Sequence, residues 1–296
     1  GGSLEMESPT FADVREAADR IAPYIHRTPV FMCGRIDDRV GATVFSKAEN
    51  QQKVGAFKAR GALNAVLSLR EDERAAGIAT HSSGNHAQAV AYAAKIVGAA
   101  ATIVMPRHAP SVKVEAVREY GATIVFCDQG HREEMLAEVV GRTGATVVHP
   151  FDHPMVVAGQ GTAALELLDE VPDLDVIVTP IGGGGLLGGT TLTAAESGIP
   201  AVGAEPEVVD DAYRSLERGE RRPATGELSV GDGLLTGIGE IAFDILRDHG
   251  TRIIRVSEDE ILEATTFVIT RSKQVIEPSA GTAYAALFRE PSWFAR

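Results

Sequence analysis

One lysine in this chain has the surroundings of a nucleophile. Lys58 lies in the run Gly55-Ala56-Phe57-Lys58-Ala59-Arg60-Gly61-Ala62, between an aromatic residue and small residues, where a helix is expected to begin. An ammonium held in a packed, apolar place loses hydration and its pKa falls, so the neutral amine can attack a carbonyl compound and form a Schiff base. Most lysines are solvated surface residues instead. The assignment of Lys58 therefore depends on the motifs that accompany it.

Two further segments are suited to bind anions. The run Thr80-His81-Ser82-Ser83-Gly84-Asn85-His86 precedes an alanine-rich helical pattern, whose free N–H groups could hold a carboxylate or a phosphate. Helix capping by Ser83 or Asn85 is the alternative. Four consecutive glycines, Gly182 to Gly185, follow a strand pattern and would let several backbone amides converge on one anion. The sequence there fits neither a Walker loop nor a dinucleotide fingerprint, so it favours a phosphate site of another kind, with a tight turn as the alternative.

Acidic residues gather in a fourth segment, Glu205-Pro206-Glu207-Val208-Val209-Asp210-Asp211. Two carboxylates and a backbone carbonyl at this spacing could bind a hard cation through oxygen atoms. A helix start stabilised by its acidic residues is an equal alternative. His149 and His153 are not expected to form a zinc pair, because Pro150 between them opposes a shared helix face.

The elements that must position these residues alternate between strand and helix patterns. Short β-branched runs occur at residues 101–106, 122–126, 146–150, 176–180 and 201–204, and helical patterns at 111–120 and 133–143. This alternation predicts βαβ units, with parallel sheets covered by helices on both faces. The expected fold class is α/β with two lobes. Residues 1–76 and 149–296 would form a large cofactor-binding lobe, and residues 77–148 a small one.

Composition excludes several classes of protein. The net charge of −13 over 296 residues argues against nucleic acid or an anionic membrane as a partner. Residues 176–195 carry no charge but are rich in glycine, which favours a buried strand and a loop over a membrane span. The two cysteines, Cys33 and Cys127, are far apart in the sequence and fit a cytoplasmic, reducing environment.

In this order, the lysine, serine-rich and glycine motifs resemble those of the threonine dehydratase and serine racemase family. Its members are pyridoxal-phosphate enzymes of the tryptophan-synthase-β fold type, also called PLP fold type II. The resemblance extends from the helical pattern at 11–21 and His26-Arg27-Thr28-Pro29 to Pro278-Ser279-Ala280-Gly281. It implies a two-lobed fold rich in parallel sheet, a pyridoxal 5'-phosphate cofactor, an amino-acid substrate and a homodimer.

The resemblance also implies a role for each motif residue. Lys58 would carry the cofactor as a Schiff base and would act on the substrate. The other cofactor-binding residues would be Phe57, Asn85, Gly182, Gly183, Gly184, Gly185 and Glu277. Residues expected to receive the substrate carboxylate are Ser82, Ser83, Gly84, Asn85 and His86. Ser83 would also be a second acid–base group opposite the lysine, and Glu205, the Val209 carbonyl and Asp211 would hold Mg²⁺ or Ca²⁺.

The activity implied is elimination of water from a β-hydroxy amino acid such as L-threonine or L-serine, which gives a 2-oxo acid and ammonia. A serine or amino-acid racemase or a β-replacement enzyme of the same family would share every motif, and a hydroxyaspartate dehydratase of the family is also an alternative. A cofactor-binding protein without turnover, with a regulatory role, is a further alternative. The sequence reaches Arg296 without the Ser-Gly-Gly-Asn-like turn whose side chain pairs with the pyridine nitrogen in the family.

Overall fold

The computed structural model describes residues 7–82, 84–128 and 130–295. The chain divides into two compact units, and each is described by itself. Unit 1 comprises Gly1–Arg27 and Gln51–Gln160, and unit 2 comprises Thr28–Asn50 and Gly161–Arg296.

Unit 1 is built on a parallel sheet of four strands in the order β5-β4-β3-β6. The strands are β3 (Ile78–His81), β4 (Ala101–Pro106), β5 (Thr123–Cys127) and β6 (Thr146–Val147). Ala79 pairs with Thr102 on one side and with Val147 on the other, so β3 is an inner strand. All four strands lie within residues 77–148, the segment expected to form the small lobe.

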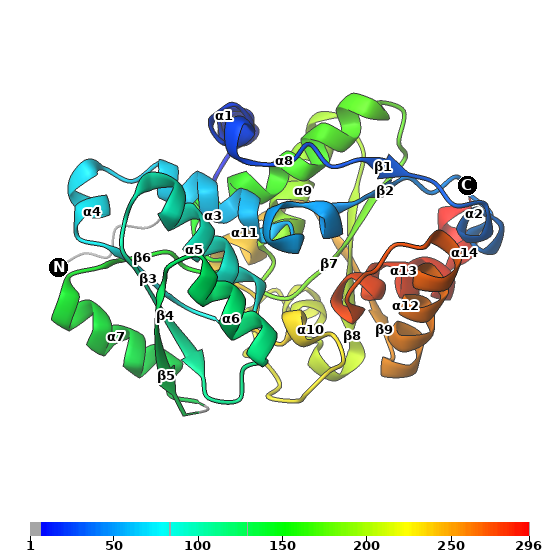
Figure 1. The fold of residues 1–296 in the computed structure, drawn as a ribbon. Coiled ribbons are helices and arrows are strands. Elements are labelled where there is room, and N and C mark those ends of the chain that lie inside the picture. Colours follow the sequence, from blue (N-terminus) through cyan, green and yellow to red (C-terminus); the bar gives the residue numbers. More distant parts are fainter. Residues whose placement is uncertain (1–6, 83, 129, 296) are drawn as a thin grey trace. The chain divides into compact units, whose positions relative to one another are not determined.

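Side chains that alternate along these strands pack against helices on both faces of the sheet. Ile78, Ile103 and Met105 share a core with α5 (Asn85–Val97) and α6 (Ser111–Glu119). Ala79 and Val104, one residue along, pack instead against α7 (Arg132–Thr143). Figure 1 shows α7 on one side of the strands and α5 and α6 on the other. The period of two follows from the pleat of a strand. The other α-helices that begin in unit 1 are α1 (Phe11–Ile21), α3 (Lys58–Leu67), α4 (Glu71–Ala75) and α8 (Pro154–Glu170).

Unit 2 contains a parallel sheet of three strands in the order β7-β8-β9, namely β7 (Ile177–Pro180), β8 (Ala201–Pro206) and β9 (Arg252–Val256). Ile177, Ala201 and Ile253 face a core with α9 (Gly185–Glu196) and α11 (Glu240–Asp248). Val202, Ala204 and Ile254 face α12 (Glu258–Ser272) and α13 (Pro278–Arg289). The unit also contains an antiparallel pair, β1 (Val30–Phe31) and β2 (Ser46–Lys47), and the helices α2 (Gly34–Val40), α10 (Asp211–Arg218) and α14 (Pro291–Phe294).

The α/β class and the parallel sheets expected from the sequence are confirmed. The uncharged stretch 176–195 forms β7, a glycine turn and most of α9, as expected for a buried strand followed by a loop. Among the described residues, no helix is long and apolar enough to cross a membrane.

Candidate functional site

Lys58 is the first residue of α3, and its amine is held against the backbone of unit 1. Lys58 Nζ donates a hydrogen bond to the Pro150 carbonyl oxygen at 3.2 Å. The Phe57 ring centroid lies 5.4 Å from the same nitrogen. Burial lowers the pKa of Lys58 from 10.5 to about 8, because a shielded ammonium loses hydration. A substantial fraction of this amine is therefore neutral slightly above neutral pH.

The turn that leads into α3 is pinned and locally strained. Val54 adopts φ +59°, a left-handed conformation that costs a β-branched residue roughly 1–2 kcal/mol. Gln52, two residues before Val54, is held in place because its side-chain amide exchanges two hydrogen bonds with the His26 backbone, at 2.7 and 2.9 Å. Strained backbone of this kind occurs often at functional sites, and here it lies four residues before Lys58.

A close helix crossing within unit 1 holds α3 in place. The Gly61 N–H donates to Gln160 Oε1 on α8 at 3.0 Å. A Cβ added to Gly159 would lie 2.7 Å from the Arg60 carbonyl oxygen, so only glycine allows this approach. Asn64, one turn further along α3, donates to the Met155 carbonyl at 2.7 Å. The position of Lys58 is thus set by contacts along α3.

The segment that we call the serine loop (residues 82–86) follows the carboxyl end of β3, an inner strand, and includes the first two residues of α5. Parallel sheets commonly bind ligands at this end of their strands. The N-cap of α5 is Gly84, so Asn85 does not cap this helix. The Gly84 N–H donates to Ser82 Oγ at 3.1 Å. A Cβ on Gly84 would lie 3.1 Å from Lys113 Nζ, which places a cationic side chain beside the loop. Ser83 lies outside the described residues.

Two neutral imidazoles accompany Lys58. His86, only 3% exposed, has Nε2 at 3.2 Å from Thr80 Oγ1 and 3.1 Å from the Val148 carbonyl. Burial, and next the charge of Lys58, lowers the pKa of His86 well below its ordinary value. His149 Nδ1 accepts the N–H groups of Phe151 and Asp152 at 3.2 and 2.8 Å, and burial lowers the pKa of His149 to about 4. Both rings are therefore uncharged at neutral pH.

The sequence does not predict the role of the segment 149–152. From the sequence, His149 is weighed only as half of a zinc pair and that role is rejected, whereas in the structure the ring organises the turn that presents the Pro150 carbonyl to Lys58. In the part of the chain that the structure describes, no group of three or more His, Cys, Asp or Glu side chains is placed to hold a metal ion.

In unit 2, the glycine loop (residues 182–185) joins the carboxyl end of β7 to the start of α9. Gly184 has φ +94°, and a Cβ there would lie 2.6 Å from the Ala242 Cβ. A Cβ on Gly182 would lie 3.0 Å from the Leu234 Cα. The loop is thus a narrow backbone turn next to a helix N-terminus, whose amides and dipole favour a phosphate. Glu277, expected near the pyridine ring, is the N-cap of α13 in the same unit.

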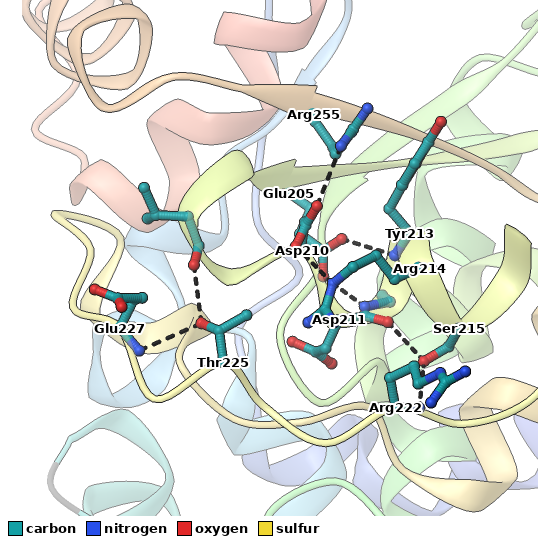
Figure 2. Close-up of polar contacts among 12 residues, drawn as sticks. Glu205, Asp210, Asp211, Tyr213, Arg214, Ser215, Arg222, Thr225, Glu227 and Arg255 are labelled. Atoms are coloured by element: carbon teal, nitrogen blue, oxygen red, sulfur yellow. Dashed lines mark hydrogen bonds and ion pairs between the residues drawn. The ribbon is translucent and has the colours of Figure 1, made fainter. Parts of the chain in front are cut away.

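Figure 2 shows Glu205 and Asp211 together at the start of α10. They form a buried carboxylate centre, in which each side chain is only 1% exposed. Glu205 accepts the N–H groups of Ala212 and Tyr213 at 3.0 and 2.9 Å, as the helix-start alternative requires. Asp211 Oδ2 accepts the Ile238 N–H at 2.8 Å, whereas Oδ1 is buried without a hydrogen-bond partner among the described residues.

Like charges and burial disfavour ionisation of this centre. Burial, and next the charge of Asp211, raises the pKa of Glu205 well above its ordinary value, and burial raises the pKa of Asp211 to about 6. The neighbouring Asp210 differs, because it forms ion pairs with Arg214 at 2.9 Å and Arg255 at 3.1 Å. Among the described residues neither Glu205 nor Asp211 forms an ion pair, although the charge of Arg214 partly offsets the raised pKa of Asp211. Val209 next to them is fully buried.

Comparisons with known proteins show the family to which the chain belongs. The sequence profile of the family described as "Pyridoxal-phosphate dependent enzyme" matches residues 21–296. Serine racemase of Dictyostelium discoideum is 44% identical over 96% of this chain and 90% of its own length. Its crystal structure superposes with a TM-score of 0.92 at 43% identity, covering 98% of this chain and 94% of that one.

Two relatives with other named activities match this chain over a similar length and at a similar identity. The beta-hydroxyaspartate dehydratase of Paracoccus denitrificans is 42% identical over 98% of this chain and 93% of its own length. The crystal structure of a threonine deaminase from T.th. has a TM-score of 0.90 at 41% identity, covering 96% of this chain and 94% of that one. The family expected from the motifs is confirmed, and the chain belongs to the pyridoxal-phosphate dependent enzymes.

Proposed function

We propose that this protein is a pyridoxal-phosphate dependent dehydratase, an ammonia-lyase that eliminates water from a β-hydroxy amino acid such as L-threonine or L-serine. The products are a 2-oxo acid and ammonia. The observation that carries the proposal is Lys58, an amine of lowered pKa at the start of α3, in a family whose members use pyridoxal phosphate. Relatives named as a threonine deaminase and a beta-hydroxyaspartate dehydratase support the elimination reaction.

The residues present fit the cofactor. Lys58 offers a neutral amine to its aldehyde, and the glycine loop, which is packed too closely to admit a side chain at Gly182 or Gly184, offers backbone amides to its phosphate. Phe57, Asn85 and Glu277 are proposed to contact its ring. When bound, pyridoxal phosphate serves as an electron sink for negative charge at the substrate Cα.

The chain's own groups would then bind the substrate and move its proton. The N–H groups at the start of α5, with the serine loop, are proposed to hold the substrate carboxylate. Lys58 Nζ is proposed to take the proton from Cα, because a base whose pKa is close to the working pH transfers protons efficiently. His86 and His149 are uncharged and therefore add no positive charge beside Lys58.

Substitution of Lys58 tests this proposal. Lys58→Ala should abolish the visible absorbance of the protein-bound cofactor and ammonia release from L-threonine and L-serine. Lys53→Ala, a lysine in the same segment, is the matched control and should retain both. An unchanged cofactor spectrum in Lys58→Ala would contradict the assignment.

Racemisation is a second candidate activity, favoured by the serine racemase relative and by Ser83 in the serine loop. We propose that Ser83 serves as an acid–base group on the face of the cofactor opposite Lys58. Ser83→Ala should then suppress formation of D-amino acid more than release of ammonia. Equal loss of both products would count against this two-sided scheme.

A dicarboxylic substrate, 3-hydroxyaspartate, is proposed as the third possibility because Lys113 lies beside Gly84 and because of the Paracoccus relative. Assaying threonine, serine and hydroxyaspartate for ammonia and for D-isomer distinguishes these activities. A protein that binds the cofactor but does not turn over would show the bound-cofactor absorbance and form no product.

We further propose that Glu205, the Val209 carbonyl and Asp211 hold Mg²⁺ or Ca²⁺. Two buried carboxylates that form no ion pair among the described residues, one with an unpaired oxygen, suit a hard cation. Adding either cation should raise the melting midpoint, a chelator should reverse the gain, and Asp211→Asn should weaken the response. If neither the cation nor the chelator changes the melting midpoint, the carboxylates serve only to stabilise the helix start.

Finally, we infer a cytoplasmic homodimer. The family resemblance supports the dimer, and Cys33 and Cys127, which are not bonded to each other, agree with a reducing compartment. Light scattering of the purified holoenzyme should give twice the mass of one chain; a monomer would contradict the dimer.

A further inference from the structure

Asp211 makes a contact that its proposed cation role does not use. Asp211 Oδ2 accepts the Ile238 N–H at 2.8 Å, and both residues are buried. A buried backbone N–H needs a partner, and here a carboxylate 27 residues away in the chain provides it. The Ile238 carbonyl is held more loosely, by the partly exposed Arg221 at 3.3 Å. Asp211 is therefore the principal hydrogen-bond anchor of the Ile238 backbone.

The residue that follows is joined to the glycine loop. The Gly239 N–H donates to the Gly183 carbonyl oxygen at 2.9 Å. The inner side of Gly184 faces Ile238 and Ala242, because a Cβ built there would lie 3.6 Å from Ile238 Cγ1 and 2.6 Å from the Ala242 Cβ. The segment 238–242 is thus the surface on which the glycine loop rests.

We infer that Asp211 is a positioning residue for the glycine loop, acting through Ile238 and Gly239 to keep that loop in shape for the cofactor phosphate. This rests on the proposed function, which assigns the phosphate to the loop. Without the carboxylate, the Ile238 N–H would be buried and unpaired, and the segment would move to reach water. Gly183 would then lose its partner, and Gly184 would lose the packing that supports its left-handed turn.

Binding of two cofactor forms tests the inference directly. The probes are pyridoxal 5'-phosphate and pyridoxal, which differ only in the phosphate, titrated by absorbance against the full chain. All solutions contain a chelator, so that the proposed cation does not contribute. Asp211→Ala should weaken pyridoxal phosphate binding by roughly tenfold to a hundredfold, the equivalent of one lost buried hydrogen bond, and pyridoxal binding by less than about threefold.

Two further variants separate positioning from general stability. Asp211→Asn retains an acceptor oxygen for the Ile238 N–H. It should therefore show the preference of the native chain, which is the ratio of its affinity for pyridoxal phosphate to its affinity for pyridoxal. Ser215→Ala removes a buried hydroxyl of the same helix, which donates to the Asp211 carbonyl at 2.6 Å, and should leave the preference unchanged. An unchanged preference in Asp211→Ala would overturn the inference, as would an equal loss in Ser215→Ala.

The outcome for the native chain distinguishes this inference from the proposed function. No preference for the phosphate form in the native chain would refute the phosphate assignment itself. If Asp211→Ala fails to fold, hydrogen exchange of the native chain decides. Pyridoxal phosphate, but not pyridoxal, should then slow exchange in peptides that cover Ile238 and Gly239, and equal effects of the two probes would overturn the inference.

Discussion

At the scale of the single residue, Lys58 owes its lowered pKa to burial and not to a neighbouring cation. The enclosing protein and the neutral rings of His86 and His149 therefore make up the environment that prepares its amine. The Pro150 carbonyl gives that amine a fixed resting position. This arrangement suits a residue that must serve first as nucleophile and then as base.

The pKa of Lys58 predicts how stability depends on pH in the cofactor-free protein. Below about pH 8 both the folded and the unfolded chain carry the proton on Lys58; between about pH 8 and pH 10.5 only the unfolded chain binds it. The unfolding free energy of the native chain, relative to Lys58→Met, should therefore rise with pH across this window, by roughly 3 kcal/mol at most. Urea unfolding at a series of pH values measures it.

Other titrating groups cancel, because they are common to the native chain and to Lys58→Met. A flat difference for Lys58→Met would mean that the ammonium is solvated in the folded protein.

The sequence predicted the place of Lys58 at a helix start, and α3 indeed begins there. It could not predict Pro150 as a partner, because every residue has a backbone carbonyl and this one lies 92 positions away. For the same reason it could not predict that Asp211 accepts the Ile238 N–H. Contacts between a side chain and distant backbone depend on the tertiary fold, whereas helix starts and glycine turns have local signals.

At the scale of the element, the crossing of α3 and α8 within unit 1 fixes the helix that carries Lys58. Gly159→Ala should destabilise the protein by about 1–3 kcal/mol, because its Cβ would lie 2.7 Å from the Arg60 carbonyl and must displace α3. Urea unfolding measures the loss, and reduced binding of pyridoxal phosphate should accompany it.

Gly141→Ala provides the control for this substitution. Gly141 lies in α7 of the same unit, and a Cβ there meets nothing within 4 Å. This change should be neutral or stabilise by up to about 1 kcal/mol, since alanine favours helix. Equal effects at Gly141 and Gly159 would show that the close helix crossing does not matter.

Strands with a continuous β-branched run could be predicted from the sequence, and those without one could not. β4, β5, β6, β7 and β8 occur where such runs were found. β9 was missed because Arg252 and Arg255 interrupt its apolar pattern. β1 and β2 were missed because a strand of two residues is too short to show a periodic pattern. The strand order β5-β4-β3-β6 also could not be deduced, because pairing depends on contacts between segments distant in sequence.

At the scale of the whole molecule, the proposed cofactor-binding residues occur in both units: Lys58 and the serine loop in unit 1, the glycine loop in unit 2. A ligand that binds only the folded state stabilises every region it contacts, by about 2.7 kcal/mol at a concentration a hundred times its dissociation constant. If one pyridoxal phosphate engages all three motifs, its binding should slow amide exchange in segments of both units.

Hydrogen exchange with and without the cofactor measures this effect, read in peptides that cover the start of α3, the start of α5 and the start of α9. Pyridoxal, which lacks the phosphate, should protect the α3 peptide of the native chain while giving little protection at α9. Pyridoxal phosphate added to Lys58→Ala should instead protect the α9 peptide while giving little protection at α3. Such opposite changes arise only if the aldehyde and the phosphate of one ligand are held by different motifs. Protection by pyridoxal phosphate that stays confined to unit 1 would contradict the assignment of its phosphate to the glycine loop.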